Sequence, residues 1–96
     1  MKIRLKSYNF DVVQSFGQSE VNLEASAATL RTLLNELTKR SGGKIELISP
    51  YSGQFNEEFI VLINGQEFRN LPQALETELK DGDEVDIGLL YILEGG

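Results

Sequence analysis

The sequence contains no cysteine, no histidine and no tryptophan among its 96 residues. Without cysteine there are neither disulfides nor thiol chemistry. Without histidine as well, a Ser-His-Asp triad, a Cys-His pair and the usual zinc sites are excluded. No glycine-rich phosphate loop of the Walker or dinucleotide type occurs. We therefore expect a protein that is not an enzyme and that binds no cofactor or metal itself.

Basic residues are also scarce, 9 against 15 acidic ones, which gives a formal net charge of −6. They are scattered along the chain, and the longest run is Lys39-Arg40. Binding to phosphates needs clustered lysine and arginine, so no direct nucleic-acid partner is expected. No apolar run approaches the roughly 18 residues of a membrane span, and the N-terminus lacks a signal-peptide hydrophobic block. These absences favour a cytoplasmic protein without a membrane partner.

The apolar pattern begins with β-structure. Residues 2–6 alternate strictly between polar and apolar, and residues 20–24 alternate again, so the first part of the chain predicts a β-hairpin. Tyr8 and Phe10 have the opposite parity to the first strand, which indicates a bend or bulge near Ser7.

The period then changes to that of a helix, which we place at about 27–40. Ser26 is the candidate N-cap, and Gly42 or Gly43 supplies a left-handed stop. One face of this helix carries a leucine stripe that is interpreted as core rather than as a zipper, because it spans about two turns. The stripe consists of Leu30, Leu33, Leu34 and Leu37.

The middle of the chain is less regular. Residues 44–48 are compatible with a short strand, whereas Pro50 and Gly53 favour a loop. The apolar run 59–63 predicts a central strand covered on both faces. Asn64-Gly65 then predicts a hairpin turn, with residues 66–68 returning as a brief antiparallel partner.

The last third predicts a short helical turn within 71–79, a turn at 80–84 and a final strand over 85–93. The acidic residues around that turn lack the spacing of an EF-hand, so we interpret them as a solvated turn. Leu90 and Ile92 fall on the opposite face of the final strand from Val85, Ile87 and Leu89. This places them either in a docking patch or beneath the 43–57 loop.

These elements together predict an α+β domain at residues 1–94, with one main helix on one face of a mixed four- to five-stranded sheet. Gly95-Gly96 follows as a flexible tail. Glycine lets another protein approach the main chain closely, so such a tail can enter a narrow channel and present its carboxylate. The alternative is a frayed end, where small residues are tolerated for no functional reason.

In this order, the elements resemble the ubiquitin-like β-grasp sulfur carriers of the MoaD and ThiS type. The resemblance covers nearly the whole chain. The segments that carry it are the opening hairpin, Thr29-Leu30 to Leu34, Val61 to Gly65, Leu79 to Val85, and Gly95-Gly96.

The resemblance implies a mechanism that needs no side-chain catalyst. A ubiquitin-activating-like enzyme would use ATP to adenylate the carboxylate of Gly96, and sulfur from a separate donor enzyme would displace AMP to leave a thiocarboxylate. Gly95 would allow passage into the partner's channel. Leu90, Ile92, Leu62 and Glu94 would bind the partners.

Within the family, the small subunit of molybdopterin synthase, which donates sulfur in molybdenum cofactor biosynthesis to a large subunit, is the first interpretation. MoaD-type chains commonly end in Phe-Pro-Pro-Val-x-Gly-Gly, but here the corresponding residues 90–94 contain no proline. The tail is therefore somewhat closer to the tRNA-thiolating or protein-modifying branches, and the chain is longer than is usual for the thiamine carrier ThiS. A further alternative is a plain β-grasp binding module whose glycines are incidental.

Overall fold

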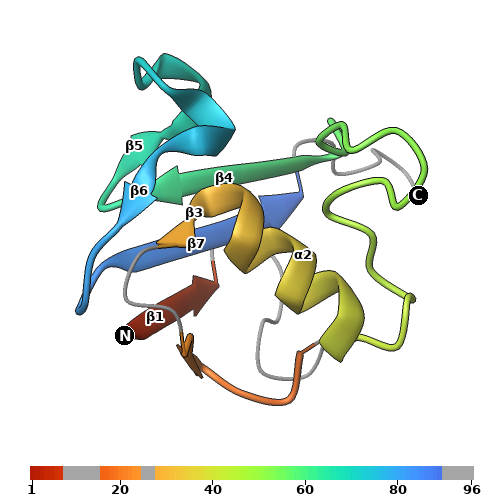
Figure 1. The fold of residues 1–96 in the computed structure, drawn as a ribbon, viewed down its shortest axis with the longest axis horizontal. Coiled ribbons are helices and arrows are strands. Elements are labelled where there is room, and N and C mark those ends of the chain that lie inside the picture. The colour runs from red at the N-terminus through yellow and green to blue at the C-terminus, as the bar shows by residue number, and fades with distance from the viewer. Residues whose placement is uncertain (8–15, 25–27, 90–96) are drawn as a thin grey trace, which may run out of the picture.

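The computed structural model describes residues 1–7, 16–24 and 28–89. It shows a five-stranded mixed sheet in the order β2 (Glu20–Asn22), β1 (Lys2–Ser7), β7 (Glu84–Leu89), β4 (Phe59–Ile63) and β5 (Gln66–Glu67). Helix α2 (Leu30–Arg40) packs across one face of this sheet (Figure 1). The first strand pairs parallel with β7, and the other neighbours in the sheet are antiparallel. The predicted α+β architecture with one main helix on a mixed sheet is confirmed.

The opening hairpin is formed by β1 (Lys2–Ser7) and β2 (Glu20–Asn22), which pair antiparallel as predicted. Ile3 and Leu5 alternate with exposed neighbours and are buried, as is Val21. Apolar side chains at every second position point to the same face, so this alternation fixes which face of the hairpin enters the core. The predicted bend near Ser7 stays a prediction, because Tyr8 and Phe10, on which it depends, lie outside the described residues.

Helix α2 extends over Leu30–Arg40, and its four stripe leucines are completely buried. The leucine stripe therefore belongs to the core, as predicted. The helix ends as expected, because the Ser41 N–H donates to the Leu37 oxygen, the Gly42 N–H donates to the Lys39 oxygen, and Gly42 has a φ of +72°.

The predicted start of the helix at 27, with Ser26 as N-cap, is wrong. The N-cap is Thr29, whose hydroxyl accepts from the Thr32 N–H at 3.3 Å. Before that point the backbone is extended, because β3 (Ala28–Thr29) pairs antiparallel with β6 (Glu78–Leu79). This second, short ladder competes with the helix for the same residues, and α2 begins only where the ladder ends.

Strand β4 (Phe59–Ile63) lies inside the sheet, as predicted for a central strand, but the prediction that it is covered on both faces is wrong. It lies between β7 and the short β5 (Gln66–Glu67), and only alternate residues are fully buried. Phe59, Val61 and Ile63 face the helix side, whereas Ile60 and Leu62 are half-buried. The physical reason is that α2 covers one face of the sheet, and within residues 1–7, 16–24 and 28–89 no helix packs against the other face of the apolar run.

The turn at Asn64-Gly65 joins β4 to β5 as predicted, with φ values of +50° and +87°. Positive φ at both central residues is characteristic of the hairpin turn that asparagine and glycine favour. The return strand is shorter than predicted, because Phe68 leaves it to begin the 3-10 helix η1 (Phe68–Asn70). Phe68 is thereby buried in the core rather than alternating along a strand.

Residues 44–48 form a loop rather than a strand, with one isolated bridge between Ile48 and Phe55. This loop nevertheless contributes to the core, since Leu47 and Ile48 are almost completely buried. The Leu47 N–H donates to the Thr38 hydroxyl at 3.0 Å, which attaches the loop to α2.

The predicted helical turn within 71–79 is the 3-10 helix η2 (Ala74–Glu76). A turn then leads into β7 (Glu84–Leu89), the middle strand of the sheet. The turn is attached to β1, because the Lys2 N–H donates to Asp81 Oδ1 at 2.6 Å and Lys2 O accepts from Gly82 at 2.7 Å. Val85 and Ile87 are buried on the helix side, as their parity predicted.

Candidate functional site on the open face of the sheet

The candidate site is the face of the sheet opposite α2, and its apolar part comes from β4. Ile60 lies opposite Gly88 in the antiparallel pairing with β7, and Leu62 lies opposite Asp86. Both β4 side chains are half-buried. Gly88 has no side chain with which to cover Ile60, although Gly88 itself is buried. We call Ile60 and Leu62 the open-face patch.

Charged residues lie beside this patch on β7, the neighbour of β4, and on β1, the strand beyond β7. Register places Arg4 against Glu84 and Lys6 against Asp86. Arg4 Nη1 is 2.9 Å from Glu84 Oε2, and Lys6 Nζ is 3.7 Å from the other oxygen of the same carboxylate. The hydrogen bond from Arg4, followed by the charge of Lys6, lowers the pKa of Glu84 below its usual value, so this carboxylate stays ionised.

The arrangement is suited to contact with another protein. An apolar centre with a charged border is the general composition of a protein interface, in which the apolar residues supply affinity and the charges supply orientation. The described residues contain no group of three or more acidic side chains placed to hold a metal ion. Within those same residues, no helix is both long and apolar enough to cross a membrane.

Of the partner-binding residues that the sequence suggested, the structure describes Leu62 and places it on the open face. Leu90, Ile92 and Glu94 lie outside the described residues, as do Gly95 and Gly96, the predicted site of activation. Sequence reasoning missed Ile60, which shares the face of Leu62. The signal was present, because residues two apart in a strand point to the same side.

A model of the ThiS family matches residues 7–87. A curated relative from Archaeoglobus fulgidus, named "Putative sulfur carrier protein", is 30% identical over 73 residues, which cover 76% of this chain and 82% of that protein. The chain belongs to the ThiS family, a group of ubiquitin-like β-grasp carrier and modifier proteins.

Solved structures share the fold. The small archaeal modifier protein 1 (SAMP1) of Methanosarcina acetivorans superimposes with a TM-score of 0.71 at 23% identity, over 97% of this chain and 96% of that one. A Pyrococcus furiosus protein named "Putative molybdopterin converting factor, subunit 1" gives a TM-score of 0.66 at 24% identity, over 95% and 99% of the two chains. At these identities the likeness concerns the β-grasp fold.

Proposed function

We propose that this chain is a sulfur carrier whose Gly96 carboxylate is adenylated and then converted to a thiocarboxylate. The observation that carries the proposal is membership of the ThiS family over residues 7–87, in a sequence whose last two positions are Gly95-Gly96. The carrier acts in the cytoplasm as a co-substrate of other enzymes rather than as an enzyme.

The chemistry requires activation, because a carboxylate is a poor electrophile until it carries a good leaving group. A carboxylate oxygen of Gly96 attacks the α-phosphorus of ATP within the activating enzyme, and pyrophosphate leaves. Sulfur at the oxidation level of hydrosulfide, supplied by a separate donor enzyme, then attacks the carbonyl carbon. The bond between this carbon and the phosphate oxygen of AMP breaks, and AMP leaves. Loss of the proton from sulfur then gives the thiocarboxylate.

The particular role that we favour is the MoaD-like small subunit of molybdopterin synthase, with a synthase large subunit as the receiving partner. The fold likeness to the Pyrococcus furiosus protein supports this role at the level of architecture. The chain itself needs no cofactor for it, since ATP is bound by the activating enzyme.

The second candidate is a protein modifier that is joined through Gly96 to lysines of target proteins. The fold likeness to SAMP1 supports it to the same extent, and residues 90–94 lack the proline pair common in MoaD-type chains. Transfer of sulfur to tRNA or into thiamine would use the same activated terminus.

Partner binding in either role is assigned to the open-face patch, with Leu90, Ile92 and Glu94 contributing from the segment after β7. Leu62 supports the assignment, because a half-buried leucine on the sheet face opposite α2 retains apolar surface for a partner. Gly95 provides passage for the main chain.

The test is to incubate the chain with its cognate activating enzyme, ATP and a sulfur donor, and to measure intact and peptide masses. Replacement of one terminal oxygen of Gly96 by sulfur is expected. The matched variant is Gly95→Val. Its β-branched side chain should obstruct the channel of the activating enzyme and reduce product formation at least about tenfold, without a change in the unfolding temperature of the chain.

Gly-Gly remnants on lysines of other proteins would identify the modifier instead. If neither product forms, and removal of Gly95-Gly96 leaves the cellular role intact, both candidates are wrong.

A further inference from the structure

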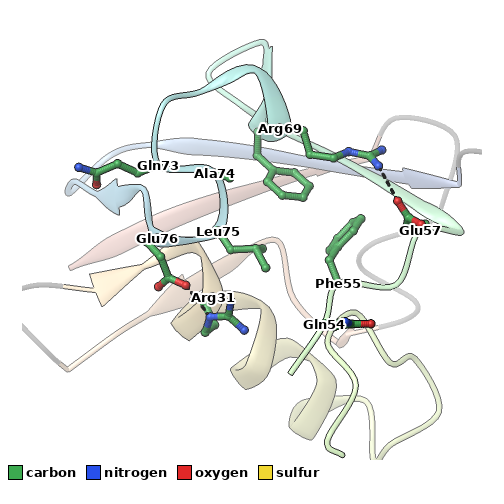
Figure 2. A pocket seen from close by; sticks show the side chains of 10 residues that line it. Arg31, Gln54, Phe55, Glu57, Arg69, Gln73, Ala74, Leu75 and Glu76 are labelled. Carbon is green, nitrogen blue, oxygen red and sulfur yellow. Dashed lines mark hydrogen bonds and ion pairs between the residues drawn. The ribbon is translucent and has the colours of Figure 1, made fainter. Parts of the chain in front are cut away.

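A groove on the helix side of the sheet lies outside the site described above. It has a volume of about 580 Å³ and is bordered by α2, the loop before β4, and the segment containing η1 and η2. Figure 2 shows Arg31 beside Glu76 at one end and Arg69 beside Glu57 at the other, with Phe55 and Leu75 between them. The volume falls within the range of pockets that bind ligands.

The Arg31 end of the groove is fixed by two hydrogen bonds. Nε donates to Glu76 Oε2 at 2.8 Å, and Nη1 donates to the backbone oxygen of Gly53. A guanidinium has five N–H donors. Two N–H donors of Arg31 are used in the bonds to Glu76 and Gly53, so the other three have no acceptor in the described part of the chain.

The Arg69 end is held in the same way. Nη1 is 3.1 Å from Glu57 Oε1, and Nε is 3.0 Å from Glu67 Oε1. The guanidinium also lies over two aromatic rings, 5.9 Å from the centre of Phe55 and 5.8 Å from that of Phe68. A planar cation held by carboxylates and rings is preorganised, so its remaining N–H donors can bind a ligand at little further entropic cost.

The wall between the two arginines is apolar. Phe55 and Phe68 meet edge to face, with ring centres 4.7 Å apart and planes at 67°. Leu75 and Phe55 are half-buried and pack against the core from the groove. An apolar side chain placed here would gain contact on several sides.

The charges determine what kind of ligand fits. Among the residues that line the groove, Arg31 pairs with Glu76 and Arg69 pairs with Glu57, so the formal charges of these four residues cancel. Glu67, the second partner of Arg69, does not line the groove. A ligand carboxylate or ammonium group would be repelled by one member of each pair as much as it is attracted by the other. A neutral group that both donates and accepts hydrogen bonds suits such a rim better.

We propose that this groove binds a neutral, apolar segment of a partner protein in extended conformation. Backbone carbonyls of the segment accept from Arg31 and Arg69, its N–H groups donate to the rim glutamates, and an apolar side chain packs against Phe55 and Leu75. Extended peptides are commonly recognised in this way: hydrogen bonds to the peptide main chain give affinity, and contacts with its side chains give selectivity.

The groove and the open-face patch lie on opposite sides of the sheet, since Arg31 belongs to α2 and Leu62 points away from it. A partner in the groove would therefore leave the open-face patch free. One chain could then bind two proteins at once, one on each side of the sheet.

The test begins with the complete chain as bait for a displayed library of random peptides. Enriched sequences are synthesised with acetylated and amidated ends and titrated into 15N-labelled protein. We expect neutral peptides with a central apolar residue, which shift the Arg31 and Arg69 Nε–H resonances and leave those of Ile60 and Leu62 unchanged. Failure to enrich any peptide, enrichment of charged peptides, or shifts confined to the open-face patch would each overturn the proposal.

Two variants with the same added charge separate the groove from the rest of the surface. Leu75→Lys places an ammonium group against the apolar wall and should weaken peptide binding about tenfold or more. Asn35→Lys adds the same charge at an exposed position of α2 and should leave binding within about twofold. Equal binding by both variants would contradict the proposal, and the resonance shifts of the unmodified chain decide the matter if Leu75→Lys fails to fold. Gly95 and Gly96 take no part, so a negative result leaves the proposed function standing.

Discussion

Arg4 and Glu84 face one another across the parallel pair of β1 and β7, with Nη1 and Oε2 2.9 Å apart. The two residues are 80 positions apart in the sequence, so the contact connects the first strand to the last described one. Lys6 approaches the same carboxylate at 3.7 Å. The hydrogen bond from Arg4 is the chief cause of the lowered pKa of Glu84.

This ion pair should make stability depend on pH in a defined direction. The pKa of Glu84 is lower in the folded chain than its ordinary value of about 4.5, so the stabilisation is complete above that value and is lost as the pH falls through the folded pKa. Glu84→Gln should therefore lower the unfolding temperature slightly at neutral pH, and the difference should shrink below about pH 4.5. Thermal unfolding followed by circular dichroism across this range measures it.

The control is Glu58→Gln, which removes an exposed carboxylate that forms none of the ion pairs within the described residues. The same pH dependence in Glu58→Gln and Glu84→Gln would show that the Arg4 contact is not its cause.

The leucine stripe of α2 should supply much of the stability of the fold. Leu34 is completely buried, and its replacement by alanine removes apolar contacts and leaves a cavity. Leu34→Ala is expected to reduce the free energy of unfolding by about 2–5 kcal/mol. Urea denaturation gives this value directly. Asn35→Ala, next along the helix but exposed, should change it by no more than about 0.5 kcal/mol, and similar losses at both positions would contradict the assignment of the stripe to the core.

Replacement by aspartate should have different effects at two adjacent residues of β4, a loss of partner binding at one and a loss of folding at the other. Leu62→Asp, on the open face, is expected to weaken binding to the activating enzyme about tenfold or more while the thermal transition remains. Val61→Asp would bury a carboxylate in the core, because Val61 is fully buried, and should abolish cooperative unfolding. Calorimetric titration and thermal scans of the two variants measure both effects.

Charged replacements of Leu90 and Ile92 should likewise impair partner binding without unfolding the domain. A lost thermal transition in either variant would show that the residue belongs to the core instead.

Local patterns predicted the elements with short-range causes. The leucine spacing of α2, the alternation of β1 and the Asn64-Gly65 turn are each determined by neighbours in sequence, and the structure agrees with all three. The start of α2 was mispredicted because Ala28-Thr29 pairs with residues near position 78, a contact that no local pattern records.

The same limit applies to the sites. A run of five apolar residues does not reveal which face of β4 a helix will cover, so Ile60 was overlooked beside Leu62. The groove depends on contacts between distant side chains, such as Arg31 with Glu76, 45 residues away. Periodicity does not show which distant side chains will contact one another. The family resemblance, by contrast, rests on short motifs and on their order along the sequence.

The position of β7 at the middle of the sheet has a consequence for how the chain is made. During synthesis β1 and β4 emerge from the ribosome well before the strand that must lie between them. Neither can complete its pairing until residues 84–89 arrive, so the sheet cannot form before β7 has been made. The apolar strand 59–63 of the nascent polypeptide would therefore stay exposed until β7 has been synthesised.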